Sequence, residues 1–215
     1  MKLYSYYRSS AAYRVRIGLN LKGLDYTYLP VNLLEKANKS PQYLDVNPQG
    51  LVPAMELPGG DVVAQSVALL EWLEDSYPDP PFLPDDPLGR VRVRSLVNSI
   101  ACDIHPLCNL AVTNYLRVEY QANDQNIIDW YCTWMHRSFI PIEQVLAENA
   151  STYSFSEQPC MADIVLVPQI YNARRFAIAL EAFPHIRRVV DNCNRLPAFA
   201  SAAPEMQADS PDQER

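Results

Sequence analysis

The hydrophobic pattern begins as alternation and then changes to helical spacing. Residues 2–6 alternate as a β-strand does. Residues 10–22 carry apolar side chains at helical intervals, crowded enough to indicate a helix buried over much of its circumference. Gly23 stands where a helix end favours a left-handed residue. Residues 25–32 alternate again, and Pro30 predicts that this strand lies at a sheet edge or ends there. The pattern predicts a parallel strand–helix–strand unit.

A second group of elements follows within the next fifty residues. A short helix is predicted near residues 41–46, and strands are predicted over residues 54–57 and 62–64, joined by a Gly-Gly turn. A helix over residues 66–77 comes next, with Ser66 as its expected N-cap. The order βαβ followed by ββα predicts a thioredoxin-like α/β domain.

Pro53 lies directly before the third predicted strand. In the trans form it would have to end a loop and start a hydrogen-bonded ladder at once. We therefore expect a cis bond between Val52 and Pro53, the alternative being a trans proline at an edge strand.

Proline marks the one convincing linker. Five prolines fall between residues 75 and 90, which excludes helix and sheet there. We expect domains over residues 1–78 and 88–215, with the linker at 79–87. Everything after the linker has helical spacing, so the second domain is predicted to be all-α.

The predicted second domain contains three further segments with distinct patterns. Residues 164–171 are nearly all apolar and could form a strand, but the flanking residues continue helically, so we predict a central buried helix. A last helix is expected over residues 184–195. The polar, proline-containing tail from Pro204 is predicted to be frayed.

Composition and charge narrow the function classes. With 215 residues, 48% of them hydrophobic and 20% charged, the chain is of ordinary globular type. A net charge of -7 argues against nucleic acid and against anionic membranes as partners. No apolar run is long enough to cross a bilayer, and the N-terminus lacks the pattern of an export leader.

Cysteine and histidine spacing argues against a disulfide framework and against a metal site. Five cysteines form no CxxC motif, and three histidines show no HxxxH spacing. A reducing, cytoplasmic environment is therefore expected.

The junction between the first strand and the first helix carries candidate chemistry. Ser9 and Ser10 stand there, where a serine oxygen commonly caps the helix. The unpaired N–H groups and the positive dipole end of a helix also favour an anion. A hydroxyl at this point can hold a thiolate. Taken alone, the two serines fit an ordinary N-cap as well as a thiolate site.

Six blocks, in this order along the chain, resemble the zeta class of glutathione transferases, which includes maleylacetoacetate isomerase and maleylpyruvate isomerase. They are RSSAAYRVRIGLNLKG, NPQGLVPAMEL, QSVALLEWLE, PFLPDDPLGRVRVR, CDIHPLCNL and MADIVLVPQIYNARRF. The resemblance extends to about Pro197. It implies the glutathione transferase fold, a thioredoxin-like domain followed by an all-helical domain, and a homodimer.

The resemblance also implies glutathione as a cofactor and a site that binds it. Ser9 would hold the glutathione sulfur, with Ser10 beside it. Val52, before Pro53, would exchange backbone hydrogen bonds with the cysteinyl part of the tripeptide, as an added strand does.

Four further residues complete the expected glutathione site. Gln65 and Ser66 would bind the γ-glutamyl carboxylate where the next helix begins. Gln49 belongs to the same loop region. Asn109, expected on the first long helix of the second domain, would reach the site or that of a neighbouring subunit.

The implied reaction acts on a small acidic substrate. The thiolate would add to the cis double bond of a maleyl compound, the bond would rotate, and glutathione would leave unconsumed. Arg8 and Arg175 would bind the substrate carboxylate, and His105 would line the pocket or make a structural hydrogen bond. Two alternatives stay open: a transferase or dehalogenase acting on small α-halo acids, and a non-catalytic glutathione-binding protein.

Three positions depart from the family pattern. Ala11 replaces the usual cysteine of Ser-Ser-Cys, and Ala111 replaces an arginine common in bacterial members, with Arg117 as a candidate replacement. Cys160 replaces the serine or threonine that usually caps the central helix. A thiol is a poor cap, so that helix is expected to begin weakly.

Overall fold

The computed structural model describes residues 1–149 and 151–211, which divide into two compact units. One unit is Met1–Pro81 together with the C-terminal segment from Arg195, and the other is Phe82–Asn194. The sequence placed the C-terminal segment with the helical domain. Asn20 instead donates to the carbonyl oxygen of Ala198 (3.1 Å) and to Ser201 Oγ (3.0 Å), which joins that segment to the first helix. The ends of the linker, predicted at residues 79 and 87, remain a prediction.

The first unit is built on a four-stranded mixed sheet of order β2-β1-β3-β4. Strand β1 pairs in parallel with β2 and antiparallel with β3, and β3 pairs antiparallel with β4. Leu3 is buried between Tyr28 and Met55 of the neighbouring strands. All four predicted strands are confirmed, and Pro30 ends the edge strand. Their bounds are β1 Lys2–Ser5, β2 Thr27–Pro30, β3 Ala54–Glu56 and β4 Val62–Ala64.

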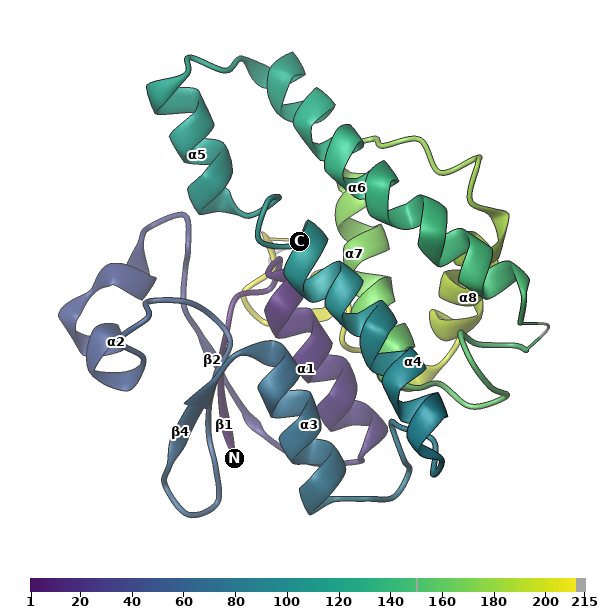
Figure 1. Cartoon of the computed structure of the whole chain (residues 1–215). Coiled ribbons are helices and arrows are strands. Elements are labelled where there is room, and N and C mark those ends of the chain that lie inside the picture. The colour runs from purple at the N-terminus through teal and green to yellow at the C-terminus, as the bar shows by residue number, and fades with distance from the viewer. Residues whose placement is uncertain (150, 212–215) are drawn as a thin grey trace. The chain divides into compact units, whose positions relative to one another are not determined.

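Helices α1 (Ser10–Leu21) and α3 (Ser66–Ser76) lie side by side in this unit (Figure 1). Helix α1 is buried over nearly all its circumference, as predicted, and Gly23 after it has a φ of +64°. The expected N-cap of α3 is wrong by one residue: Gln65 occupies that position and Ser66 is the first helical residue. The smaller helices of the unit are η1 (Ala37–Lys39), α2 (Pro41–Val46), α9 (Pro197–Ala200) and η3 (Pro204–Met206).

The second unit is helical, as predicted, and is organised around α7. Ten successive residues of α7, Met161 to Ile170, are buried, because the helix packs against both α4 and α8. The apolar run at 164–171 is therefore a helix and not a strand. The unit contains α4 (Pro87–Asn98), the π-helix η2 (Ser99–Ile104), α5 (Leu110–Glu119), α6 (Asp124–Ala147), α7 (Met161–Arg175) and α8 (Pro184–Cys193). Within the described residues, no helix is both long and apolar enough to cross a membrane.

Residues 204–211 of the C-terminal tail pack into the first unit, so the expectation of fraying is wrong for them, while residues 212–215 lie outside the described residues. Pro204, Gln207 and Ser210 are buried. The side chain of Gln207 donates to the backbone oxygens of Ser201 (2.9 Å) and Ala203 (2.8 Å). Polar residues that suggested a solvated tail instead bond to the backbone of the first unit.

A buried carboxylate secures the start of α7. Asp163 Oδ2 accepts from the backbone N–H of Cys160 (2.8 Å), and Oδ1 accepts from the N–H (2.9 Å) and hydroxyl (2.7 Å) of Ser154. Asp163 and Ser154 are both fully buried. Cys160 is the N-cap residue and has extended backbone angles. Because a thiol is a weak hydrogen-bond acceptor, the Asp163 carboxylate supplies the strong hydrogen bonds at this helix start.

Replacing Cys160 with threonine should raise the melting temperature by about 2–4 °C. A hydroxyl oxygen accepts from the N3 N–H better than a thiol does, and the gain of a good cap is about 1 kcal/mol. Circular dichroism melting of both proteins measures it. Cys160→Ala is the control and should not gain stability. An equal or lower melting temperature for the threonine variant would show that Asp163 already satisfies this helix start.

Candidate active site

Ser9 is the N-cap of α1, and its oxygen is already an acceptor. Ser9 Oγ accepts from the backbone N–H of Ala12 at 3.2 Å. A hydroxyl has one proton to donate besides its acceptor lone pairs, so this contact leaves the O–H of Ser9 available to an anion. Ser10 follows as the first helical residue, and both serines are half-buried. The capping role and a thiolate-binding role are therefore compatible in one side chain.

The turn before Ser9 is held from two sides. The buried guanidinium of Arg16 donates through Nη2 to the carbonyl oxygen of Tyr7 (2.9 Å) and through Nε to that of Ala202 (2.9 Å). Asp209 of the C-terminal tail accepts from the N–H of Tyr7 (3.0 Å) and from the hydroxyl of Tyr28 (2.6 Å). These contacts fix the segment that leads into Ser9.

Replacing Asp209 with alanine should lower turnover about tenfold. Loss of the Asp209 carboxylate would release the N–H of Tyr7 and so loosen the turn that holds Ser9. Displacing a reacting group by about 1 Å can cost up to 100-fold in rate. Tyr28→Phe removes one of the two bonds and should lose less. Steady-state kinetics with a melting curve for each variant measure both effects. Unchanged turnover in Asp209→Ala would mean that the tail does not position Ser9.

Val52 presents its backbone at the end of an anchored loop. The bond from Val52 to Pro53 is cis, as predicted. The preceding residue is fixed, because Leu51 O accepts from the Tyr43 hydroxyl (2.6 Å) and from Asn47 Nδ2 (2.8 Å). In the part of the chain that the structure describes, no hydrogen bond to the half-buried Val52 backbone is found. The Val52 backbone can therefore form hydrogen bonds with an extended peptide.

The start of α3 brings together three of the predicted binding residues. Gln65, with a left-handed φ of +75°, donates through Nε2 to Gln49 Oε1 at 2.8 Å. The buried Ser66 Oγ accepts from Nη1 of the buried Arg14 at 3.2 Å. A helix N-terminus backed by a guanidinium favours a carboxylate.

Arg8 belongs to the first unit, where its guanidinium carbon lies 5.6 Å from the ring centroid of Tyr7. The remaining predicted residues belong to the second unit. The prediction that Asn109 lies on the first long helix is wrong. It is the N-cap of α5, and its Oδ1 accepts from the N–H of Val112 at 2.9 Å. His105 is half-buried and follows the π-helix directly. The exposed Arg175 places its guanidinium 4.3 Å from the ring centroid of Phe176. Arg117, the candidate replacement for the missing arginine at 111, pairs with Asp124 at 2.8 Å.

Comparison with known proteins agrees with this arrangement. Residues 8–76 match the family "Glutathione S-transferase, N-terminal domain". A maleylacetoacetate isomerase of Pseudomonas aeruginosa is 45% identical over 98% of this chain and 99% of that protein. The chain belongs to the zeta class of glutathione transferases. Among solved structures, a holo maleylpyruvate isomerase described as a bacterial zeta-class glutathione S-transferase is 44% identical, with a TM-score of 0.95 over 98% of this chain and 100% of that one.

A further zeta-class relative has been solved with the tripeptide. The maleylacetoacetate isomerase of Anaeromyxobacter dehalogenans with bound GSH in its active site is 39% identical, with a TM-score of 0.88 over 98% of this chain and 97% of that one. This likeness supports a glutathione site in the glutathione transferase fold of the present chain.

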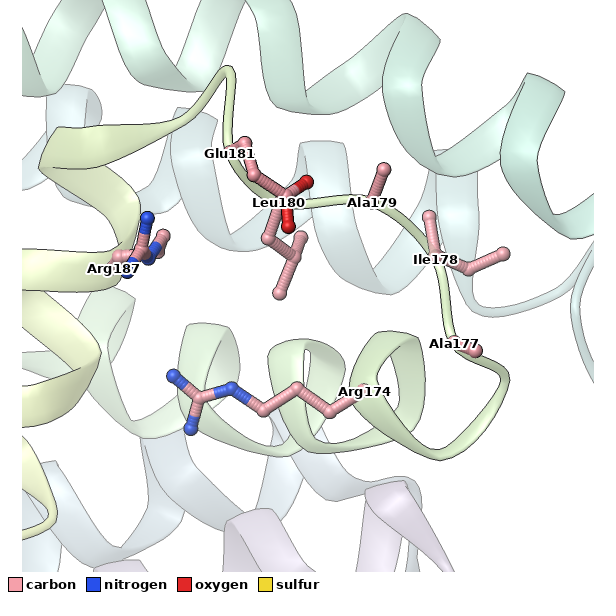
Figure 2. A pocket seen from close by; sticks show the side chains of 7 residues that line it. All are labelled: Arg174, Ala177, Ile178, Ala179, Leu180, Glu181 and Arg187. Atoms are coloured by element: carbon pink, nitrogen blue, oxygen red, sulfur yellow. The ribbon is translucent and has the colours of Figure 1, made fainter.

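The second unit of this zeta-class chain contains a pocket that none of the predicted site residues lines. It has a volume of about 600 Å³ and lies in the second unit, under residues 177–181 (Figure 2). Arg174 of α7 and Arg187 of α8 border it, and Arg174 pairs with Asp191 at 3.1 Å. No pattern in the sequence indicated this pocket. It is lined by Arg174, Ala177, Ile178, Ala179, Leu180, Glu181 and Arg187.

Proposed function

We propose that this protein is a glutathione-dependent cis–trans isomerase of the maleylacetoacetate or maleylpyruvate type. The observation that carries the proposal is the likeness to the holo maleylpyruvate isomerase, which is 44% identical over nearly the full length of both chains at a TM-score of 0.95. The substitutions at Ala11 and Ala111 leave the serine of the proposed mechanism in place.

The residues of the first unit fit glutathione. Ser9 has a hydroxyl proton to donate to sulfur, with Ser10 beside it. Val52, before Pro53, has backbone groups to pair with a peptide. The α3 N-terminus at Gln65 and Ser66, with Gln49 bonded to Gln65, suits the γ-glutamyl carboxylate.

When bound, glutathione would supply a thiolate for reversible addition to the cis double bond of the substrate. Ser9 stabilises the sulfur anion by a charge-assisted hydrogen bond, and the N–H groups at the start of α1 add to the favourable potential. Asn109, which caps α5, is the remaining residue that we assign to glutathione binding.

We assign the acidic substrate to Arg8, Arg175 and His105. Guanidinium groups bind carboxylates through paired hydrogen bonds, and a half-buried imidazole can donate one more. Arg8 immediately precedes Ser9 in the turn that Asp209 and Arg16 hold, and this adjacency supports its assignment to the substrate.

An assay that follows both product and thiol tests the function. The protein is incubated with maleylpyruvate or maleylacetoacetate and a tenfold deficit of glutathione. Conversion of all the substrate to the fumaryl isomer with the thiol retained supports isomerisation. Thiol consumed in proportion to product, or chloride released from a small α-chloro acid without isomerisation, supports the transferase or dehalogenase alternative. Glutathione binding without any turnover supports the non-catalytic one.

We further propose a homodimer in the cytoplasm. The zeta-class resemblance implies the dimer, and light scattering on the purified protein should give twice the mass of one chain. The cytoplasmic assignment is supported by five cysteines that are all free thiols.

A further inference from the structure

Cys132 and His136 form a thiol–imidazole pair on one face of α6. They lie one helical turn apart, with Cys132 Sγ 3.7 Å from His136 Nδ1. The other ring nitrogen, Nε2, lies 3.0 Å from the carbonyl oxygen of Ala179. A carbonyl oxygen only accepts, so in the neutral ring Nε2 carries the proton and Nδ1 presents its lone pair to the sulfur. The edge of Phe183, 5.2 Å between ring centroids, supports this orientation.

The other four cysteines lack this combination of access and base. Cys108, Cys160 and Cys193 are buried, and burial raises the pKa of each thiol, that of Cys108 to about 12. Cys102 is exposed, but its sulfur contacts Asn98 Oδ1 at 4.0 Å, and an amide does not act as a base. Cys132 is half-buried and has an imidazole positioned to take its proton.

A pocket borders the same loop. Ala179, whose carbonyl oxygen orients His136, also lines the pocket of about 600 Å³ described above. Arg174 and Arg187 face its space from two helices (Figure 2). Arg174 is paired with Asp191, and Glu181 is also in the lining. Among the described residues, Arg187 has no ion pair, so its guanidinium can pair with an anionic group in the pocket, although neither Cys132 nor His136 is among the lining residues.

We propose that Cys132 is a site of reversible thiol–disulfide exchange with the disulfide of a small anionic thiol, for which glutathione disulfide is the co-reactant. His136 Nδ1 takes the thiol proton as Cys132 Sγ attacks one sulfur of that disulfide. A new S–S bond forms to Cys132 and the old S–S bond breaks. The second sulfur leaves as a thiolate with the electron pair, so Cys132 is oxidised and one glutathione is reduced. The reaction uses none of the residues assigned to isomerisation.

The experiment incubates the protein with glutathione disulfide and follows the adduct by intact mass and peptide mapping. We expect one glutathionyl group per chain, located on Cys132, released by dithiothreitol and lost in Cys132→Ser. His136→Gln should slow the reaction about tenfold or more without changing the melting temperature, because it removes the base. Cys102→Ser, the matched control at an exposed thiol, should leave the rate unchanged. Faster modification of Cys102, or an unchanged rate in His136→Gln, would overturn the proposal.

A neutral disulfide tests the pocket. Arg187→Gln should slow exchange with glutathione disulfide but not with bis(2-hydroxyethyl) disulfide, since only the first carries carboxylates. If Arg187→Gln and the unchanged protein exchanged at equal rates with both reagents, Arg187 and its pocket would have no part in the reaction. Because the readout is the adduct and not turnover, failure here is distinguishable from failure of the proposed isomerase activity.

Discussion

Ser9→Ala should lower isomerase turnover about 10- to 100-fold with the protein still folded. A hydrogen bond from a hydroxyl to an anion contributes about 1.5–3 kcal/mol, which corresponds to that range of rates. The structure leaves the Ser9 proton available, because the oxygen acts as an acceptor toward Ala12 N–H. Initial rates at saturating glutathione, with the maleyl substrate varied, measure the loss.

The control for this substitution must separate the thiolate contact from the cap. Ser40 caps α2 in the same way, with Oγ accepting from the N–H of Tyr43 at 3.3 Å. Ser40→Ala should therefore lose a similar cap contribution of about 1 kcal/mol with turnover unchanged. Ser9→Asn keeps a capping acceptor and should recover stability without recovering turnover. Equal activity in Ser9→Ala and the unchanged protein would remove the catalytic role of this hydroxyl.

Asp163→Ala should lower the free energy of unfolding by about 3 kcal/mol. Three donors, from Ser154 and Cys160, lose their acceptor in a fully buried place, and each unsatisfied group costs about 1–3 kcal/mol. Burial raises the pKa of the Asp163 carboxyl, so removing the charge recovers some desolvation energy and the net loss is smaller than the sum. Urea unfolding followed by circular dichroism measures it.

Asp191→Ala is the matched control for a carboxylate on the surface. Asp191 pairs with Arg174, but both side chains are about half exposed, and such pairs contribute about 0–1 kcal/mol. The midpoint of its urea transition should stay close to that of the unchanged protein. If Asp163→Ala lost no more stability than Asp191→Ala, the bonds at the start of α7 would not be important for this fold.

Local pattern was enough to predict most of the elements. The alternation at residues 2–6 and 25–32, with the helical spacing between them, predicted the parallel β1–α1–β2 unit that the structure shows. The apolar run of α7 was separable from a strand because the helical pattern continues on both sides. The error at Ser66 has a visible cause: its oxygen accepts from Arg14, and Gln65 occupies the N-cap position without a side-chain capping hydrogen bond.

Contacts between distant residues left no signal in the sequence. Asp209 bonds to Tyr7 and Tyr28, 202 and 181 positions away, and its polar surroundings suggested a frayed tail. Arg16 was not singled out in the sequence, yet its buried guanidinium holds the turn before Ser9. Such pairs follow from the folded arrangement and not from periodicity, so the support of the site was missed although Ser9 itself was identified.

A crystal structure with glutathione tests the central claim most directly. We expect the tripeptide to lie along the backbone of Val52, with its γ-glutamyl carboxylate at the start of α3. Its sulfur should lie within about 3.5 Å of Ser9 Oγ, the distance range of a hydrogen bond to sulfur in proteins. A tripeptide whose sulfur lies far from Ser9 and Ser10, or crystals grown in millimolar glutathione that show none bound in the first unit, would contradict it.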